Sequence, residues 1–302
     1  MRSQWIAVTI ALALWAAPPP APAAAAQLRV VATFSILGDL VRNVGGERLA
    51  LHTLVGPDQD IHTFEPDPLD GAALTRAAVV FENGLGFEVW LEKLYRSSRS
   101  AARRVAVTDG LEPLYLYESR LGRREPDPHM WHDPARAAHM VRRVRDALAA
   151  TDPPNAEFFN ANAQRYMDEL RALDAWIFEQ VKALQTPGRI FVTAHGSLEY
   201  FAARYGFRIP GSALDSLTTE ASDPSAGGLA ALVKEIRSAG VRAVFPESIH
   251  SRRLMERLAA EAGVRLGPTL YTDSLGRPGT PGETYLKAMR YNVQAIVRAL
   301  RP

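Results

Sequence analysis

Apolar positions along the chain recur at intervals that predict strands alternating with helices. A first set of short, apolar and β-branched runs lies at 28–36, 49–55, 78–81 and 105–107, with a helical stretch at 37–44. A second set lies at 190–193, 241–245 and 264–270, with a helical stretch at 228–239. Because alternation of this kind is typical of parallel sheets covered by helices, the pattern predicts two α/β units.

A single long amphipathic helix is predicted between the two sets, over residues 155–185. Its apolar residues keep spacings of three and four: Phe159, Ala163, Tyr166, Leu170, Leu173, Ile177, Val181 and Leu184. Pro153-Pro154 and Pro187-Gly188 bracket it. At ~1.5 Å per residue the helix would be about 45 Å long. We therefore expect an α/β fold of two parallel-sheet lobes, 27–153 and 187–302, joined by one long rigid helix at 154–186.

Residues 1–26 are typical of a secretory signal peptide rather than of a folded segment. Arg2 provides a positive start, Trp5 to Ala17 is an apolar run too short to span a bilayer comfortably, and the small residues Ala23 to Ala26 suit a cleavage site. The alternative, an N-terminal membrane anchor, is disfavoured by three consecutive prolines at 18–20. We expect an exported, periplasmic protein.

Charge and cysteine content narrow the possible chemistry. Lys and Arg number 35 against 33 Asp and Glu, a formal net charge of +2, so no strong field attracts nucleic acid. The sequence contains no cysteine. Disulfides, thiolate metal sites, iron–sulfur clusters and a lipid-modified cysteine are thereby excluded, and a transition-metal site must be built from His, Asp and Glu.

Three of the seven histidines lie where open α/β sheets place ligands. His62 follows the strand that ends at Val55, and His195 follows the strand predicted at 190–193. His129 lies in a proline-bracketed segment that precedes a helix. A fourth segment of this kind, 271–276, follows the run ending at Leu270 and contains Asp273.

The other four histidines favour simpler interpretations. His52 is expected at the surface of its strand, and His139 lies within a helical run. His250 follows Glu247 in a loop and is either an outer contact of a site or unrelated to it. His132 is three residues from His129, but the pair lacks the Glu and the helical frame of a metalloprotease His-Glu-x-x-His motif.

Five elements, in order, resemble the metal-specific solute-binding proteins of ABC transporters, the zinc and manganese group called cluster A-I. They cover essentially the whole chain after residue 26: Asp60-Ile61-His62-Thr63-Phe64-Glu65-Pro66; Asn83-Gly84-Leu85-Gly86-Phe87-Glu88 with Trp90-Leu91; Asp127-Pro128-His129-Met130-Trp131 with Asp133-Pro134; His195 with Tyr200-Phe201 and Tyr205-Gly206; and Asp273-Ser274-Leu275-Gly276 with Tyr285-Leu286 and Asn292.

The resemblance implies a metal site between the lobes. Its ligands would be His62 and His129 from the N-terminal lobe, and His195 and Asp273 from the C-terminal lobe. It also implies capture of a metal ion and delivery to a membrane permease with its ATPase. A periplasmic metallochaperone is a further candidate partner, and the protein is expected to be a monomer.

Zinc is favoured over manganese as the metal. Three imidazoles and one carboxylate suit Zn²⁺, whereas Mn²⁺ prefers a larger share of oxygen ligands. In the family that the chain resembles, a Glu in place of the third His is the common manganese or iron arrangement, and here the residue is His195. Two features depart from the zinc members: residues 110–126 contain no histidine, and Ile61 replaces the usual Pro.

Two other functions are weighed against this interpretation. A zinc-dependent hydrolase would need an open water position and a nearby base such as Glu65 or Glu247, but a fourth ligand at Asp273 would close the site. A surface adhesin would need a means of retention at the cell surface. We therefore expect a binding protein that is not an enzyme, with Glu65, Asp60 and Glu247 as candidate acceptors that orient the imidazoles, and with release through local movement of the loops around Asp273 or His195.

Overall fold

Four parallel strands form the sheet of the N-terminal lobe in the computed structural model, which describes residues 26–118, 121–185, 188–219 and 224–301. In chain order the strands are β1 (Leu28–Phe34), β2 (Leu49–Val55), β3 (Val79–Glu82) and β4 (Arg103–Ala106). Their order across the sheet is β2-β1-β3-β4. Val30 pairs with Leu51 on one side and with Val79 on the other. Nearly all of the predicted signal peptide lies outside the described residues.

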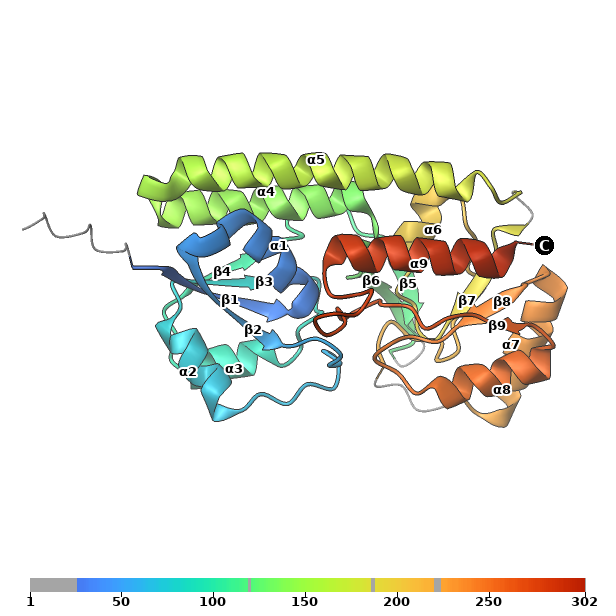
Figure 1. Ribbon diagram of the computed structural model, residues 1–302. Helices are drawn as coiled ribbons and strands as arrows, with labels where there is room; N and C mark the ends of the chain where they lie inside the picture. Colours follow the sequence, from blue (N-terminus) through green and yellow to red (C-terminus); the bar gives the residue numbers. More distant parts are fainter. Residues whose placement is uncertain (1–25, 119–120, 186–187, 220–223, 302) are drawn as a thin grey trace, which may run out of the picture.

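Helices cover both faces of this sheet (Figure 1). Helices α1 (Ser35–Gly45) and α4 (Pro134–Thr151) lie on one face, and α2 (Pro68–Arg76) and α3 (Leu91–Ser97) lie on the other. Asp67 caps α2 in a reciprocal pair with Asp70, and Asp133 caps α4 before a proline at its first position. A short 3-10 turn, η1 (Gly46–Arg48), leads from α1 into β2.

The C-terminal lobe repeats this layering on a smaller scale. Its parallel sheet has the order β7-β8-β9, with β7 (Phe191–Thr193), β8 (Ala243–Phe245) and β9 (Arg265–Leu266). Helices α7 (Ala226–Ala239) and α8 (Arg252–Ala262) lie on one side, and α6 (Glu199–Tyr205) and α9 (Tyr285–Leu300) lie toward the other (Figure 1). The two parallel sheets confirm the predicted α/β class.

The long helix α5 (Ala156–Val181) runs the length of both lobes beside α4 (Figure 1). The 3-10 turn η3 (Pro153–Asn155) joins the two helices. All eight apolar residues that predicted the helix are buried. The helix ends at Val181, earlier than predicted, and its 26 residues give a length of about 39 Å. The division into 27–153, 154–186 and 187–302 stays a prediction, and residues 186–187 lie outside the described chain.

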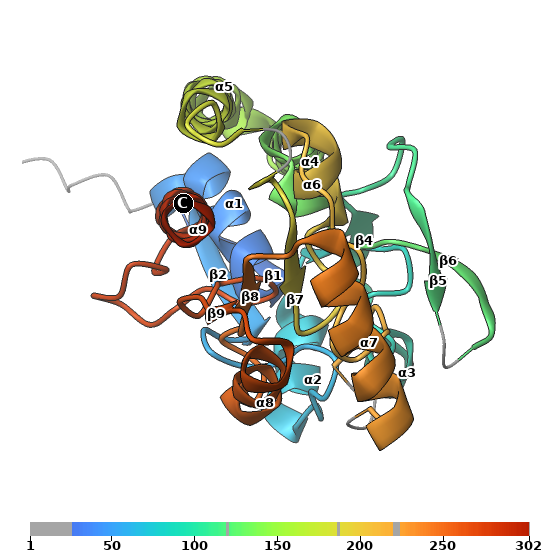
Figure 2. The same cartoon turned by 90° about the vertical axis from the view of Figure 1, so that its right-hand side faces the viewer.

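An antiparallel hairpin, β5 (Tyr115–Glu118) with β6 (Arg123–Pro126), stands to one side of both lobes (Figure 2). It was not predicted, because its strands are short and lack the apolar alternation of a half-buried strand. From β6 the chain passes through the 3-10 turn η2 (Met130–His132) into α4.

Two strands end at least two residues earlier than predicted, each for a local reason. The strand predicted at 28–36 ends at Phe34 because α1 begins at Ser35, and the buried residues of β1 continue without a break into those of the helix. The strand predicted at 264–270 is paired only at Arg265–Leu266. Gly267 and Pro268 follow, and proline has no N–H for the ladder.

One hydrophobic cluster crosses the boundary between the lobes. It contains Val31 and Phe81 of the first sheet together with Phe191 and Phe245 of the second. Helix α9 adds to this link: the backbone N–H of Tyr285 donates to Asp39 Oδ2 on α1 at 3.0 Å. A shared core and the long helix α5 position the two lobes on either side of the segments that contain the predicted site. Within the described residues, none of the helices is long and apolar enough to cross a membrane.

Candidate metal centre

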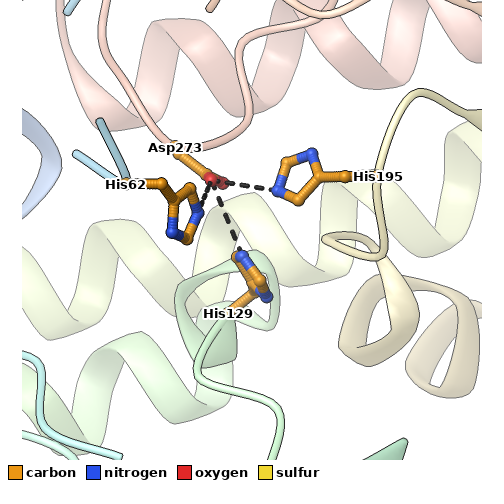
Figure 3. Close-up of side chains that lie close together, drawn as sticks. All are labelled: His62, His129, His195 and Asp273. Atoms are coloured by element: carbon orange, nitrogen blue, oxygen red, sulfur yellow. Dashed lines mark hydrogen bonds and ion pairs between the residues drawn. The ribbon is translucent and has the colours of Figure 1, made fainter. Parts of the chain in front are cut away.

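The four residues predicted as ligands converge on one point between the lobes (Figure 3). Their ligating atoms all lie within 4.8 Å of one another. Asp273 Oδ2 is 3.0 Å from His62 Nε2, 3.0 Å from His195 Nε2 and 3.6 Å from His129 Nε2. All four side chains are buried, and His62, at 6 % exposure, is the most open of them.

The two histidines of the N-terminal lobe are positioned by the same local hydrogen bond, from the histidine N–H to an aspartate two residues earlier. Asp60 accepts the backbone N–H of His62 and Asp127 accepts that of His129, in both cases through Oδ1 at 2.9 Å. A carboxylate that binds the N–H two residues later is typical of an Asx-turn. Asp-x-His therefore fixes the direction in which each histidine leaves its loop.

The two aspartates differ in their second contact. Asp127 Oδ1 also lies 2.7 Å from His129 Nδ1, so that Nε2 faces the centre. Asp60 turns its other oxygen to the hydroxyl of Thr219 in the C-terminal lobe and thereby ties the His62 loop across the boundary. Trp90 Nε1 holds the same loop by donating to the carbonyl of Ile61 at 3.1 Å.

His195 is oriented by a carboxylate from a distant part of the chain. Glu247 Oε2 lies 2.7 Å from His195 Nδ1, and Glu247 Oε1 accepts the backbone N–H of His195 at 3.0 Å. The hydroxyl of Thr272 donates to Glu247 Oε2 at 2.7 Å. Glu247 therefore links His195 to the loop of Asp273 and leaves His195 Nε2 facing the centre.

The Asp273 loop is bound to the N-terminal lobe by several hydrogen bonds. Trp131 Nε1 donates to the carbonyl of Thr272 at 2.9 Å, and the backbone N–H of Leu275 donates to Ser35 Oγ at 2.9 Å. The N–H of Asp58 donates to the carbonyl of Leu275 at 2.9 Å. Movement of Asp273 out of the centre would break these contacts between the lobes.

Aromatic rings enclose the centre on the side of the N-terminal lobe. The ring of Phe87 lies edge-on to His62 and His129, with centroids 5.2 and 5.7 Å apart. Trp131 packs against His129 at 5.3 Å. The imidazoles therefore lie against apolar aromatic rings. In such surroundings the electrostatic interactions between the imidazoles and the carboxylates are stronger than in water.

The buried charges of the centre perturb one another. Burial lowers the pKa of His129, but the negative charges of Asp273 and Asp127 outweigh burial and raise that pKa to about 9. Burial likewise disfavours charged His195, yet Glu247 and Asp273 hold its pKa well above the usual value. Burial raises the pKa of Asp273, while His195 and His129 hold it well below its usual range. The negative charge of the buried carboxylates therefore favours a positive charge at the centre, beside Asp273.

The remaining candidates fall outside the centre. His52 is exposed, as predicted, and His139 Nε2 lies 2.9 Å from the carbonyl oxygen of Asp109. His132 is buried, and burial lowers its pKa to about 3, which makes it a neutral side chain near the centre. Glu65 is exposed and was wrongly expected to orient an imidazole. Asp127 was missed in that role, although its spacing before His129 matches that of Asp60 before His62.

The sequence profile of one protein family spans nearly the whole described chain. This family is described as ZnuA, the periplasmic component A of the zinc-uptake complex, and its profile matches residues 30–299. The chain belongs to this family. The resemblance seen in the sequence motifs is thereby confirmed.

Curated and solved relatives of this chain differ in the metal they are described with. The manganese-binding lipoprotein MntA of Halalkalibacterium halodurans is 33% identical over 90% of this chain and 88% of its own length. The periplasmic zinc-binding protein TroA of Treponema pallidum has a TM-score of 0.84 and 29% identity over 92% of this chain and all of its own. The Mn-bound periplasmic metal-binding protein of Candidatus Liberibacter asiaticus has a TM-score of 0.82 and 28% identity over 91% of this chain and all of its own.

Proposed function

We propose that this protein captures Zn²⁺ between its two lobes and delivers it to an ABC-type import permease. One observation carries the proposal: three imidazoles and one carboxylate, contributed by four separate loops of both lobes, converge in a buried centre. His62, His129, His195 and Asp273 are the proposed ligands. A cation at this point supplies the positive charge that the buried carboxylates require.

The distances within the centre support a four-ligand site. With bonds of ~2.0–2.1 Å and tetrahedral angles, ligating atoms of zinc are about 3.3 Å apart. Asp273 Oδ2 lies 3.0–3.6 Å from the three Nε2 atoms. Asp127 and Glu247 occupy the Nδ1 atoms of two imidazoles, which is how carboxylates orient metal-bound histidines.

Manganese is the second candidate cargo. The donor set favours zinc, because three nitrogen ligands suit Zn²⁺ better than Mn²⁺. The names of relatives favour manganese, since MntA is described as manganese-binding and a solved relative holds Mn. In both cases the role is the same, and only the selected ion differs.

The surroundings of the centre favour a binding protein over a hydrolase. A hydrolytic zinc site keeps an open position for water and a base beside it. Glu247 is engaged by the N–H of His195 and by Thr272, and Glu65 is exposed. With Asp273 as the fourth ligand, neither glutamate is placed to activate a water molecule on the metal.

The proposed setting is the periplasm, with the permease and its ATPase as partners. A metallochaperone that loads the site is a further proposed partner, and we propose a monomer.

Curated relatives are described as lipoproteins, whereas this sequence has no cysteine for lipid attachment. Fractionation of cells that produce the full chain tests the location: protein in the osmotic-shock fraction agrees with it, and protein in the membrane pellet contradicts it.

A competitive titration tests the function and the metal together. The demetallated protein is titrated with Zn²⁺ and with Mn²⁺ against a chelator of known affinity, and the bound metal is counted by elemental analysis. We expect one tightly held zinc per chain and much weaker manganese. If the protein binds manganese more tightly than zinc, the transported ion is manganese and the proposed role in metal import is unchanged. If neither metal binds tightly, the proposed function is wrong.

A further inference from the structure

A cavity of about 290 Å³ lies against only one of the four proposed ligands, His62. His129 and His195 have no exposed surface, and Asp273 has almost none. The ring of His62 therefore separates the cavity from the closed centre. At about 30 Å³ per water molecule, the cavity has room for an ion that keeps several waters of hydration.

One wall of the cavity is a turn with an unusual and well-fixed backbone. Gly84, Leu85 and Gly86 have consecutive positive φ angles of 89°, 57° and 77°. Glu88 holds this turn, because its buried carboxylate accepts the N–H of Asn83 at 2.6 Å and the hydroxyl of Thr33 at 2.7 Å. The turn places Leu85, Gly86 and Phe87 along the cavity as a rigid wall.

The opposite wall comes from the hairpin β5–β6 and from the C-terminal lobe. Leu121, Glu125 and Leu217 line this side. Glu118, at the end of β5, accepts the backbone N–H of Leu217 at 2.8 Å and the hydroxyl of Ser216 at 2.9 Å. The hairpin, which stands away from the two sheets in Figure 2, is thereby pinned to the C-terminal lobe beside the cavity.

We infer that the metal ion reaches and leaves the centre through this cavity, past His62, between the turn at 83–88 and the hairpin β5–β6. This inference rests on the proposed function. His62 is then the first ligand that an incoming ion meets and the last that a departing ion leaves. The exposed apolar side chains Val89 and Leu121 flank the mouth of the route, at 70 % and 58 % exposure.

The absence of cysteine from the sequence allows a specific test. The variant Val89→Cys is labelled with a bulky maleimide to obstruct the mouth. The matched control is Leu69→Cys with the same label, because Leu69 is equally exposed at 72 % in the same lobe but does not line the cavity. Leu121→Cys repeats the obstruction from the hairpin side. Zn²⁺ association and dissociation rates are measured by stopped flow against a zinc-sensitive chelator.

An obstructed route slows passage in both directions without changing the end states. We expect labelled Val89→Cys and Leu121→Cys to lose about tenfold or more in both rates, with Kd within about twofold of wild type. Labelled Leu69→Cys keeps wild-type rates. Wild-type rates in both labelled cavity variants would overturn the route, and so would a change in Kd with an unchanged association rate. Wild-type protein that binds no zinc or manganese would instead contradict the proposed function.

Discussion

In the N-terminal lobe, each histidine of the centre has its backbone N–H bound by an aspartate two residues earlier, Asp60 or Asp127. In the C-terminal lobe, His195 is held by Glu247, 52 residues later in the chain. Asp273 depends on contacts with the other lobe, through Trp131 and Ser35. Contacts between residues close in the sequence therefore position the two histidines of the N-terminal lobe. Contacts between distant parts of the chain position His195 and Asp273.

Removal of Asp273 should have the largest effect, because its Oδ2 contacts histidines of both halves. We expect Asp273→Ala to weaken zinc binding by well over the ~100-fold typical of losing an outer partner. Competitive titration against a chelator measures the loss. Asp168→Ala, an exposed aspartate on α5, is the matched control. An unchanged affinity in Asp273→Ala would rule out the four-ligand centre.

Loss of the distant carboxylate should have the next largest effect. Glu247→Gln removes the charge beside His195 Nδ1, and we expect zinc affinity to fall by about 10–100-fold. Glu65→Gln is the matched substitution at the exposed glutamate and should leave affinity unchanged. The same titration applies to both variants. Equal losses in the two variants would show that Glu247 has no special part in orienting His195.

The two aspartates of the N-terminal lobe offer a finer comparison. Asp127→Asn weakens the contact to the His129 ring, and we expect about a tenfold loss of zinc affinity. Asp60 contacts the backbone of His62 and the hydroxyl of Thr219 but not an imidazole ring, so Asp60→Asn should cost about one hydrogen bond, roughly 1 kcal/mol. Zinc titrations of both variants test this difference. A larger loss in Asp60→Asn than in Asp127→Asn would reverse the assignment of roles.

The same contrast explains which parts of the fold the sequence could predict. Regular spacing predicted α5 and seven of its buried apolar residues, together with the buried Leu184 just after the helix, because a helix face is a local pattern. The hairpin β5–β6 was missed, since its short strands carry charges such as Arg123 and Arg124 and owe their place partly to contacts with Leu217 and Ser216. Such contacts leave no periodic signal.

The candidate centre was predicted in the same uneven way. Motif resemblance located all four residues that converge, but among the expected acceptors only Glu247 contacts an imidazole, Asp60 contacts a backbone N–H, and Glu65 is exposed. Asp127 could have been found from its spacing before His129. Glu247 was among the candidates, but the sequence could not single it out as the partner of His195, because it does not reveal that the loop after β8 lies beside the loop after β7.

The smallest expected effect concerns the stability of the metal-free protein. The charges of Asp273 and Asp127 outweigh burial and raise the pKa of His129 to about 9, above the ~6.5 of an unfolded histidine. A raised pKa stabilises the folded state below pH ~6.5, and this contribution is lost as pH rises through about 9. We expect the Tm of the demetallated protein to fall across this window, at about 2–4 °C for each kcal/mol of stability lost.

Calorimetry with and without chelator separates this effect from general alkaline unfolding. Bound metal keeps the imidazoles deprotonated, so the Tm of the loaded protein should stay nearly constant over the same window. Asp127→Asn should lower the pKa of His129, so that the fall in Tm ends at a lower pH. Glu65→Gln should leave the pH range of that fall unchanged. A metal-free Tm that rises between pH 7 and 9 would show that protonated imidazoles do not balance the buried carboxylates. A neighbouring carboxylate such as Asp127 would then have no measurable effect on the protonation of its histidine.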